Sequence, residues 1–256
     1  MKEVKVILTG AAGRMGKAIM SLAEKDEKIS VVAAVDVSPI QCGVPCYSGI
    51  GEVPTELSAD VIIDFSHHTA LEGILVYAKA AKCAVVICTT GHTEEEIELL
   101  NEYSKEIAVF RSGNMSLGIN LLMSLVKKAA AALDGYDIEI IEKHHNQKLD
   151  APSGTALMLA DAAKEGVSYE AELTYDRHSV RAKRKATEIG MHSVRGGTIV
   201  GEHEVIFAGH DEVVTLSHSA NSREVFARGA LSAAVYMKGR TSGLYSMANV
   251  IESVIK

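Results

Sequence analysis

The sequence has no excess of positive charge, and this absence narrows the range of partners. Its 256 residues include 26 Lys and Arg against 33 Asp and Glu, a formal net charge of −7. A surface that binds nucleic acid normally carries a large basic patch. The run Lys183-Arg184-Lys185 is a short basic segment of the kind that usually forms a solvated face. We therefore expect no nucleic-acid partner.

The sequence also lacks a long hydrophobic run and a cysteine framework. No segment approaches the roughly 20 apolar residues that a membrane helix needs. The N-terminus, MKEVKVILTG, is a short charged start that leads directly into a strand pattern, unlike a signal peptide. The four cysteines lack a zinc-ligand spacing: Cys42, Cys46, Cys83 and Cys88. We expect buried, reduced thiols in a cytoplasmic protein, no metal site and no membrane partner.

The first part of the chain alternates apolar runs with helical patterns. The apolar runs cover residues 4–9, 29–35, 60–65, 84–89 and 107–110. The helical patterns cover residues 14–25, 70–82 and 94–105, the last opening after Thr93, a favourable N-cap. Strands that are apolar on both faces and are separated by helices predict a parallel sheet covered on both sides. The fold class is therefore α/β, with an N-terminal, Rossmann-type doubly wound sheet.

The pattern changes in the second part of the chain. Helices are expected at 117–133 and 153–165, and a strand at 138–141. From Ile189 polar and apolar residues alternate, which predicts two or three strands with turns at Gly196-Gly197 and at residues 209–211. From Arg223 the tail returns to helices and is expected to pack on the first domain. This gives a dinucleotide-binding domain of residues 1–115 plus 225–256, and an α+β domain of residues 116–224.

A glycine-rich loop, GAAGRMG, joins the first strand to the first helix. Gly10, Gly13 and Gly16 permit a sharp turn and a close approach of phosphate oxygens to backbone amides at a helix start. The spacing departs from GxGxxG, since Ala11 stands where the first glycine of that pattern belongs. The strand before, the helix after and an acid 20 residues beyond Gly16 supply the required context.

That acid is Asp36, at the end of the second strand. A carboxylate there can accept hydrogen bonds from the ribose hydroxyls of NAD, whereas a 2′-phosphate would meet like charge. The next residue is Val37 and not a compensating arginine, which favours NADH over NADPH. Arg14 or Lys17 can still reach a phosphate, so NADPH remains possible. A strand-end aspartate that only caps a turn is the structural alternative.

The segment EIIEKHHNQKLDAPSGTA, residues 139–156, brings several ionisable groups together. His144 or His145 can supply a proton near neutral pH, and Lys148 can hold a carboxylate or donate a proton. Gly154 and Thr155 open a helix and can bind a second carboxylate through backbone amides and the hydroxyl. This arrangement suits a small dianionic molecule that is reduced and then protonated.

These histidines can also be explained without a catalytic role. A pair of adjacent histidines can simply lie at the surface, and His67-His68 is a second pair in the same chain. A zinc site is disfavoured because there is no HExxH and the remaining histidines are scattered.

Taken together, the motifs resemble the 4-hydroxy-tetrahydrodipicolinate reductase (dihydrodipicolinate reductase) family of lysine and diaminopimelate biosynthesis. The matching segments run nearly from end to end: GAAGRMG, DFS at 64–66, TTG at 89–91, SGNMSLGIN at 112–120, EKHHNQKLDAPSGTA at 142–156 and VRGGTIVGEHEVIFAG at 194–209. The resemblance implies a Rossmann domain completed by the C-terminal helices, and a second domain whose sheet builds a homotetramer. It also implies that a cyclic imine with two carboxylates loses water, accepts a hydride and is then protonated.

The resemblance assigns roles to individual residues. His144 would donate the proton, with Lys148 donating to the substrate or holding its carboxylate, and His145, Gly154 and Thr155 would complete the substrate pocket. The cofactor pyrophosphate would lie on Gly10, Arg14, Met15 and Gly16, and the ribose on Asp36. The nicotinamide end would be lined by Thr89, Thr90, Gly91 and by Ser112, Asn114 and Met115. The chain departs from the family at Asn146 and Gln147, where arginine and histidine are frequent, so no role is assigned to these two.

Two other functions remain open from the residues alone. One is a different two-domain NAD(P)-dependent reductase; a semialdehyde dehydrogenase is disfavoured because no cysteine lies in the second domain. The other is a non-catalytic protein that senses NADH, which would bind the cofactor without substrate-dependent turnover. If the protein is a reductase, the cofactor and the substrate bind to different domains, and we expect a hinge between the two domains.

Overall fold

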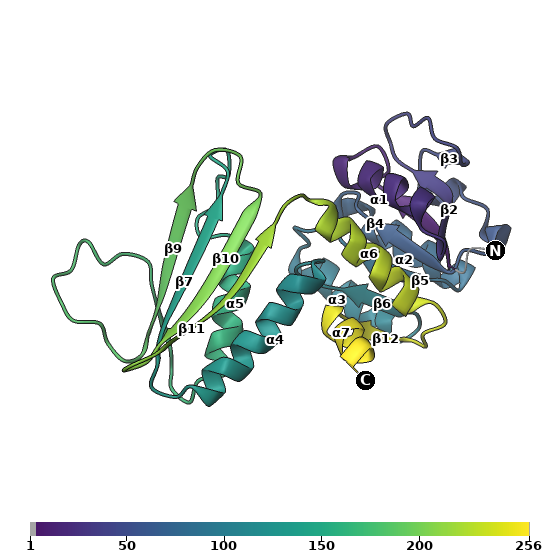
Figure 1. Ribbon diagram of the computed structural model, residues 1–256. Helices are drawn as coiled ribbons and strands as arrows, with labels where there is room; N and C mark the ends of the chain where they lie inside the picture. The colour runs from purple at the N-terminus through teal and green to yellow at the C-terminus, as the bar shows by residue number, and fades with distance from the viewer. Residues whose placement is uncertain (1–3, 256) are drawn as a thin grey trace. The chain divides into compact units, whose positions relative to one another are not determined.

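The computed structural model describes residues 4–255, and the chain divides into two compact units (Figure 1). The first unit runs to Leu117 and resumes at Glu224, so the C-terminal segment returns to it. The second unit is Gly118–Arg223.

The first unit contains a parallel sheet of seven strands in the order β12-β6-β5-β4-β1-β2-β3. The strands are β1 (Val4–Thr9), β2 (Ile29–Val35), β3 (Cys46–Tyr47), β4 (Val61–Asp64), β5 (Ala84–Ile87), β6 (Ala108–Arg111) and β12 (Gly243–Tyr245). The order reverses at β1, which lies between β2 and β4, as in a Rossmann sheet. The predicted doubly wound sheet is confirmed.

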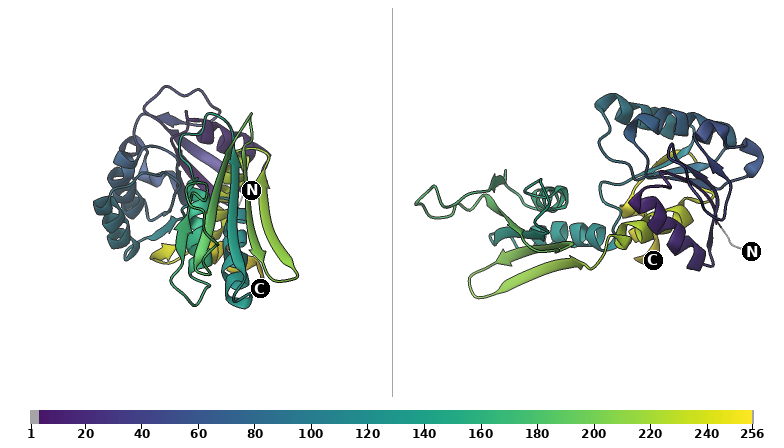
Figure 2. Two further views of the ribbon diagram at one scale, coloured as in Figure 1. Left: turned by 90° about the vertical axis from the view of Figure 1, so that its left-hand side faces the viewer. Right: turned by 90° about the horizontal axis from the view of Figure 1, so that it is seen from above.

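Helices cover both faces of this sheet (Figure 2). They are α1 (Arg14–Lys25), α2 (Leu71–Ala81), α3 (Glu94–Ser104), α6 (Glu224–Met237) and α7 (Met247–Ile255). Along β1, Val6 and Leu8 pack with residues of α1, α6 and α7, whereas Ile7 packs with residues of α2 and α3. Alternate side chains of one strand are thus buried on opposite faces, which explains the continuous apolar runs.

Two short strands of the first unit could not be predicted from the sequence pattern. The tail was predicted to return to helices, but it also contains the three-residue strand β12, which pairs with β6 at one edge of the sheet. At the other edge, the two-residue strand β3 pairs with β2. Strands this short cannot show an alternation of polar and apolar residues, so only the tertiary pairing defines them.

The second unit is a mixed five-stranded sheet in the order β11-β10-β7-β9-β8. Its elements are α4 (Leu117–Ala132, starting one residue before the unit), β7 (Asp137–His144), α5 (Gly154–Lys164), β8 (Glu172–Thr174), β9 (Glu188–Arg195), β10 (Gly201–Ala208) and β11 (Val213–Ala220). The predicted α+β class is confirmed, and the two or three strands expected from Ile189 are three: β9, β10 and β11. The predicted strand at 138–141 in fact continues to His144, since buried polar residues at its end obscure the apolar pattern.

One face of the five-stranded sheet packs against α4 and α5. At one end this face is apolar, with Ile138 and Ile140 of β7 opposite Val205 and Phe207 of β10. At the other end the buried side chains of β7 become polar. The fold therefore places a group of ionisable side chains at one end of a covered hydrophobic face.

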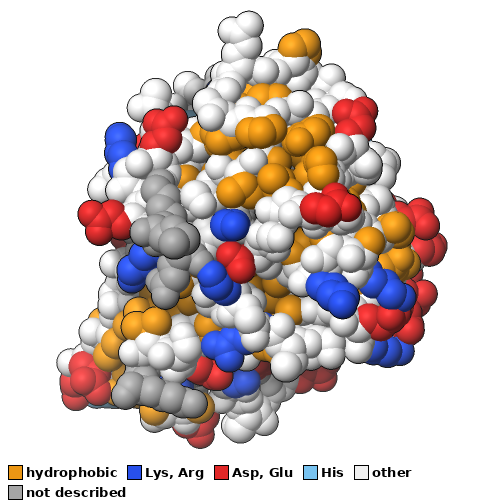
Figure 3. Space-filling model, turned by 90° about the vertical axis from the view of Figure 1, so that its right-hand side faces the viewer, with side chains coloured by type: hydrophobic (Ala, Val, Ile, Leu, Met, Phe, Trp, Pro, Cys, Tyr) orange, Lys and Arg blue, Asp and Glu red, His pale blue; other side chains and the backbone are white. Residues whose placement is uncertain are grey.

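The membrane, charge and cysteine expectations from the composition are partly met in the structure. Among residues 4–255, no helix is both long and apolar enough to cross a membrane. On the face drawn in Figure 3, basic and acidic side chains are interspersed. The expectation of buried thiols holds for Cys83 but is wrong for Cys46, which is exposed, and for Cys42 and Cys88, which are half-buried. Cys46 begins the edge strand β3 and Cys42 lies in the loop before it, whereas Cys88 lines a pocket at the end of β5.

Candidate active site

The glycine loop between β1 and α1 is closely packed by backbone. Gly10 has φ +74°, and a Cβ atom there would lie 2.3 Å from the carbonyl oxygen of Phe65. A Cβ atom on Gly16 would lie 2.3 Å from the carbonyl oxygen of Gly10. Gly13 is the N-cap of α1 and carries no side-chain cap. The loop therefore needs glycine at positions 10 and 16, and it places a helix N-terminus where an anion can approach it.

Asp36 connects the end of β2 to this loop. Its Oδ2 accepts a hydrogen bond from the backbone N–H of Ala12 at 2.9 Å, and its Oδ1 accepts one from Ser38 N–H at 2.9 Å. The following Val37 is 90% exposed. The carboxylate is thus held beside the glycine loop, and it also caps a turn, which was the structural alternative to a ribose-binding role.

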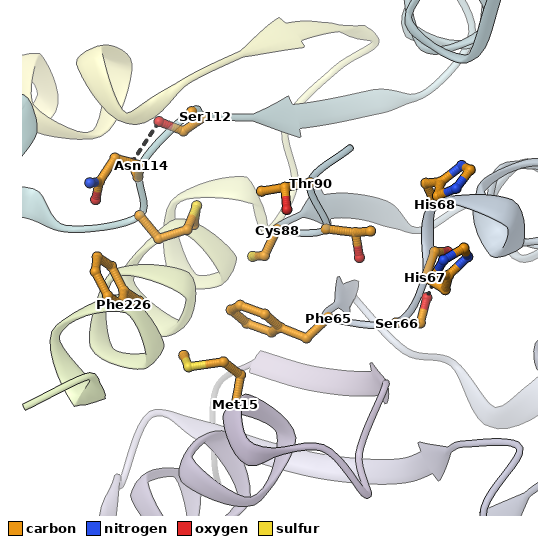
Figure 4. A pocket seen from close by; sticks show the side chains of 13 residues that line it. Met15, Phe65, Ser66, His67, His68, Cys88, Thr90, Ser112, Asn114 and Phe226 are labelled. Carbon is orange, nitrogen blue, oxygen red and sulfur yellow. Dashed lines mark hydrogen bonds between the residues drawn. The ribbon is translucent and has the colours of Figure 1, made fainter. Parts of the chain in front are cut away.

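A pocket of about 560 Å³ lies at the carboxyl ends of the central strands (Figure 4). This edge, next to the point where the strand order reverses, is where open parallel sheets bind their ligands. In Figure 4 the thioether of Met15 and the ring of Phe65 lie close together at the pocket, with Phe226 of α6 nearby. Six predicted cofactor residues line the pocket: Met15, Thr89, Thr90, Ser112, Asn114 and Met115.

A second pocket, of about 350 Å³, shares Phe65, Ser66 and His67 with the first. Its lining includes the predicted residues Gly10, Gly13 and Asp36. The predicted residues Arg14, Gly16 and Gly91 line neither pocket. Gly16 is buried beneath the loop, whereas Arg14 and Gly91 are exposed.

Asp64, at the end of β4, fixes the backbone beneath both pockets. Its buried carboxylate accepts hydrogen bonds from Thr9 Oγ1 at 2.5 Å and Thr89 Oγ1 at 2.6 Å. It also accepts from the N–H and the hydroxyl of Ser66. One carboxylate thereby ties together the ends of β1 and β4 and the residues that follow β5. The sequence marked the DFS motif only as a family match, because burial of the aspartate is not visible in the sequence.

His67 and His68, the pair without an assigned role, both line the larger pocket. His68 Nδ1 lies 2.9 Å from a carboxylate oxygen of Glu96. Glu96 is also the third residue of the capping box of α3, whose N-cap is Thr93 as predicted. The hydrogen bond with His68 is the main cause that lowers the pKa of Glu96. This network holds the pocket wall against the start of α3.

In the second unit, Glu142 lies at the centre of the polar group on β7. Its side chain is 1% exposed and forms a paired contact with the guanidinium of Arg195, at 2.8 and 2.7 Å. The ring nitrogen Nδ1 of His144 lies 2.6 Å from Glu142 Oε2. The backbone N–H of Ser153 donates to Glu142 Oε1 at 3.1 Å. The carboxylate thus has partners on three sides, as a buried charge requires.

These contacts control the ionisation of Glu142. Burial opposes ionisation, but hydrogen bonds from Arg195, His144 and Ser193 outweigh it and lower the pKa of Glu142 to about 2. An ionised Glu142 accepts a hydrogen bond from the N–H at Nδ1 of His144, which fixes the orientation of the ring. Neither Glu142 nor Arg195 is among the site residues predicted from the sequence. The arginine is 53 residues away along the chain, and only the pairing of β7 with β9 brings it opposite His144.

His203 is a further buried group on the same face. Its Nε2 lies 3.0 Å from the hydroxyl of Ser153, the N-cap of α5, and its ring meets that of His144 edge to face at 5.2 Å. Burial, together with the nearby His144, lowers the pKa of His203 to about 4, so this ring is neutral at physiological pH. It packs between His144 and the start of α5.

The remaining predicted substrate residues follow His144 along the chain. Lys148 Nζ forms an ion pair with Asp150 at 2.8 Å and is close enough to His203 to contribute to the lowering of its pKa. His145 and Thr155 are half-buried, and Gly154 is exposed as the first residue of α5. The N-cap of this helix, Ser153, donates its backbone N–H to Glu142, the carboxylate that also contacts His144. Such a start can hold a carboxylate.

Two family models together match nearly the whole chain. The model described as "Dihydrodipicolinate reductase, N-terminus" matches residues 4–115, and "Dihydrodipicolinate reductase, C-terminus" matches residues 118–251. The chain belongs to the dihydrodipicolinate reductase family. The resemblance drawn from the motifs is therefore confirmed.

Curated relatives agree with this assignment to the dihydrodipicolinate reductases. A 4-hydroxy-tetrahydrodipicolinate reductase of Caldanaerobacter subterraneus is 53% identical over 249 residues, which cover 97% of this chain and 98% of the relative. The protein of the same name from Clostridium novyi is 48% identical over 251 residues, again covering 97% and 98%.

Solved structures confirm the fold. A dipicolinate-bound dihydrodipicolinate reductase from Paenisporosarcina superposes with a TM-score of 0.78 at 24% identity, covering 95% of this chain and 97% of that one. A myo-inositol 2-dehydrogenase from Lactobacillus plantarum superposes with a TM-score of 0.62 at 12% identity, covering 99% and 94%. The two-domain architecture is thus shared with other dehydrogenases, and the fold alone does not identify a dihydrodipicolinate reductase.

Proposed function

We propose that this chain reduces 4-hydroxy-tetrahydrodipicolinate to tetrahydrodipicolinate with a nicotinamide cofactor, and that His144 protonates the product. Membership of the reductase family supports the reaction, which belongs to lysine and diaminopimelate biosynthesis. The observation that carries the role of His144 is the buried contact of its Nδ1 with Glu142, which is itself clamped by Arg195. Such an oriented imidazole is suited to general acid catalysis.

The substrate is a ring with two carboxylates, so it needs two anion-binding groups. We assign one to the ammonium group of Lys148 and the other to the backbone amides and hydroxyl at Gly154 and Thr155, with His145 at the same pocket. The dipicolinate in the Paenisporosarcina structure is also a ring with two carboxylates, which supports this class of ligand. On binding, a substrate carboxylate competes with Asp150 for Lys148.

The proton is delivered from Nε2 of His144. Glu142 holds Nδ1, so the imidazole can release a proton only from its other nitrogen. A Cβ atom at position 201 would lie 3.1 Å from Nε2, and glycine at this position leaves room beside that nitrogen. Neutral His203 supports the ring from the side and does not place a second positive charge next to it.

The family uses a nicotinamide cofactor, and the residues of the first unit fit one. When bound, the reduced nicotinamide supplies the hydride. The glycine loop, Arg14 and Met15 would hold the pyrophosphate, and the pocket lined by Thr89, Thr90 and Asn114, next to Gly91, would hold the ring. Asp36 beside the glycine loop favours NADH, since a 2′-phosphate there would meet an ionised carboxylate with no arginine next to it.

We also infer a homotetrameric, cytoplasmic enzyme, as the family resemblance implies. The face of the second sheet opposite α4 and α5 carries half-buried charged pairs such as Lys143 with Glu202, and exposed apolar side chains such as Val194. This is the face on which we expect subunits to associate.

The deciding experiment follows NADH absorbance with purified protein, with and without a coupled synthase that supplies the cyclic imine. We expect NADH oxidation only when the imine is formed. Oxidation with a sugar or another carbonyl compound, and none with the imine, would instead point to a different two-domain dehydrogenase. NADH binding without any turnover would point to a sensor.

A further inference from the structure

The loop between β2 and β3 contains two thiols in contact. The sulfur atoms of Cys42 and Cys46 are 3.2 Å apart. Both thiols also converge on the carbonyl oxygen of Val44, at 3.8 Å from Cys42 and 3.2 Å from Cys46. Cys46 is exposed and Cys42 is half-buried, so reagents can reach the pair from solvent.

The approach of the two thiols is fixed by the fold on both sides. Cys46 begins β3, whose register pairs it with Ala34, and Ala34 N–H donates to Pro45 O at 3.0 Å. On the other side, Cys42 packs against the hydrophobic core of the first unit together with Ile40 and Val44. A disulfide has an S–S bond of about 2.05 Å, so the two sulfurs need to move together by only about 1 Å.

The other two cysteines, Cys83 and Cys88, are much less reactive. Burial raises the pKa of Cys83 to about 12, and burial also raises the pKa of Cys88 far above its ordinary value. Since the thiolate is the reactive form, these two thiols are poor nucleophiles and serve as internal controls.

We propose that Cys42 and Cys46 form a dithiol modification site that reacts with small-molecule disulfides to give an intramolecular disulfide. The exposed Cys46 thiolate attacks one sulfur of the reagent and forms a mixed disulfide with it, and the other sulfur of the reagent leaves as a thiolate. Cys42 then attacks Cys46 Sγ and expels the second thiol. The two cysteines lose two protons and two electrons, and the reagent disulfide is reduced to two thiols.

The site is positioned to act on the cofactor pocket. The loop starts after Asp36 and Val37 and leads beyond β3 to Ser48 and Ile50, and all four residues line the smaller pocket. A bond between Cys42 and Cys46 therefore restrains the segment that joins two walls of that pocket. Because a pre-ordered site loses less entropy on binding, we expect the oxidised protein to bind NADH about two- to fivefold more tightly. This effect rests on the proposed cofactor role of Asp36, whereas formation of the disulfide does not.

The experiment treats the full-length protein with oxidised glutathione and maps its cysteines by mass spectrometry. The hydrogen bond with Cys42 raises the pKa of Cys46, so the reaction is run at mildly alkaline pH. We expect the mass to fall by two hydrogens, with a linked peptide pair containing Cys42 and Cys46. Cys83→Ser should retain this product, and Cys46→Ser should lose it. A stable glutathione adduct without the internal bond, or a bond that involves another cysteine, would overturn the site.

NADH titrations of the reduced and the oxidised protein then test the effect on the pocket. Cys42→Ser, which cannot form the bond, should give the same dissociation constant before and after oxidation. The oxidised wild type could prove to be fully linked and yet bind NADH with unchanged or weaker affinity. That result would overturn the effect of the disulfide on the pocket, but not the modification site itself. Failure of both forms to bind NADH would instead contradict the proposed cofactor.

Discussion

The replacement Glu142→Gln removes the buried negative charge that orients His144, and its effect on stability can be worked out from the structure. The contacts of Glu142 lower its pKa from the ordinary 4.5 to about 2. A pKa difference of this size corresponds to about 3 kcal/mol of stability at neutral pH. The glutamine is nearly isosteric, but it leaves the guanidinium of Arg195 without a counter-charge. We therefore expect the free energy of unfolding to fall by about 3 kcal/mol at pH 7.

The pH dependence of this loss follows from the sign of the shift. A carboxylate with a lowered pKa in the folded state stabilises the protein above pH 4.5, and this contribution is lost as the pH falls towards 2. The difference between wild type and variant should therefore shrink to roughly half its neutral value by pH 3. Urea unfolding followed by circular dichroism at several pH values measures this difference.

The same variant tests the catalytic part of the reasoning. Without an ionised acceptor at Nδ1, His144 loses its fixed orientation, and we expect kcat to fall by about a hundredfold. The affinity for NADH, which we assign to the first unit, should not change. Glu139→Gln is the matched control, because Glu139 also lies on β7 and is paired with Arg184, but sits on the opposite face of the sheet. The reasoning is refuted if the two variants lose similar stability, or if Glu142→Gln retains wild-type turnover.

Three further predictions concern two proposed binding residues, Lys148 and Asp36, and the buried Asp64. Lys148→Ala should lower kcat and raise KM for the imine while leaving the dissociation constant of NADH unchanged, which steady-state kinetics and a separate NADH titration can resolve. Asp36→Asn removes a like charge near a 2′-phosphate, so the ratio of kcat/KM for NADPH to that for NADH should rise by about tenfold; an unchanged ratio would contradict the ribose role. Asp64→Asn replaces one of two acceptor oxygens in a buried network, and thermal unfolding should show a loss of about 1–3 kcal/mol; a neutral result would mean that the hydroxyls re-pair without cost.

The parts of the fold that could be predicted are those whose structure depends on residues close together in the sequence. The alternation of apolar runs and helices at residues 4–110 reflects a sheet buried on both faces, and the glycines of the first loop reflect backbone contacts at Gly10 and Gly16. The edge strands β3 and β12 are too short to leave such a pattern and depend on pairing with β2 and β6.

In the candidate site, too, the local features could be predicted and the long-range contacts could not. The segment with His144 and Lys148 is contiguous, and its chemistry can be read from residue types. Glu142 lies within that segment, but its role depends on Arg195, which arrives from β9 through strand pairing. The contact of His203 with His144 likewise depends on the register of β10 against β7. Long-range pairing of this kind is not encoded in local spacing, so the residues that hold His144 could not be predicted from the sequence.

The most direct test of the account compares turnover of wild type and His144→Gln with NADH and the cyclic imine, with NADH affinity measured alongside. Our account predicts that kcat falls by about 10²- to 10⁴-fold in the variant while the dissociation constant of NADH is unchanged. Turnover close to that of the wild type would show that another group protonates the product.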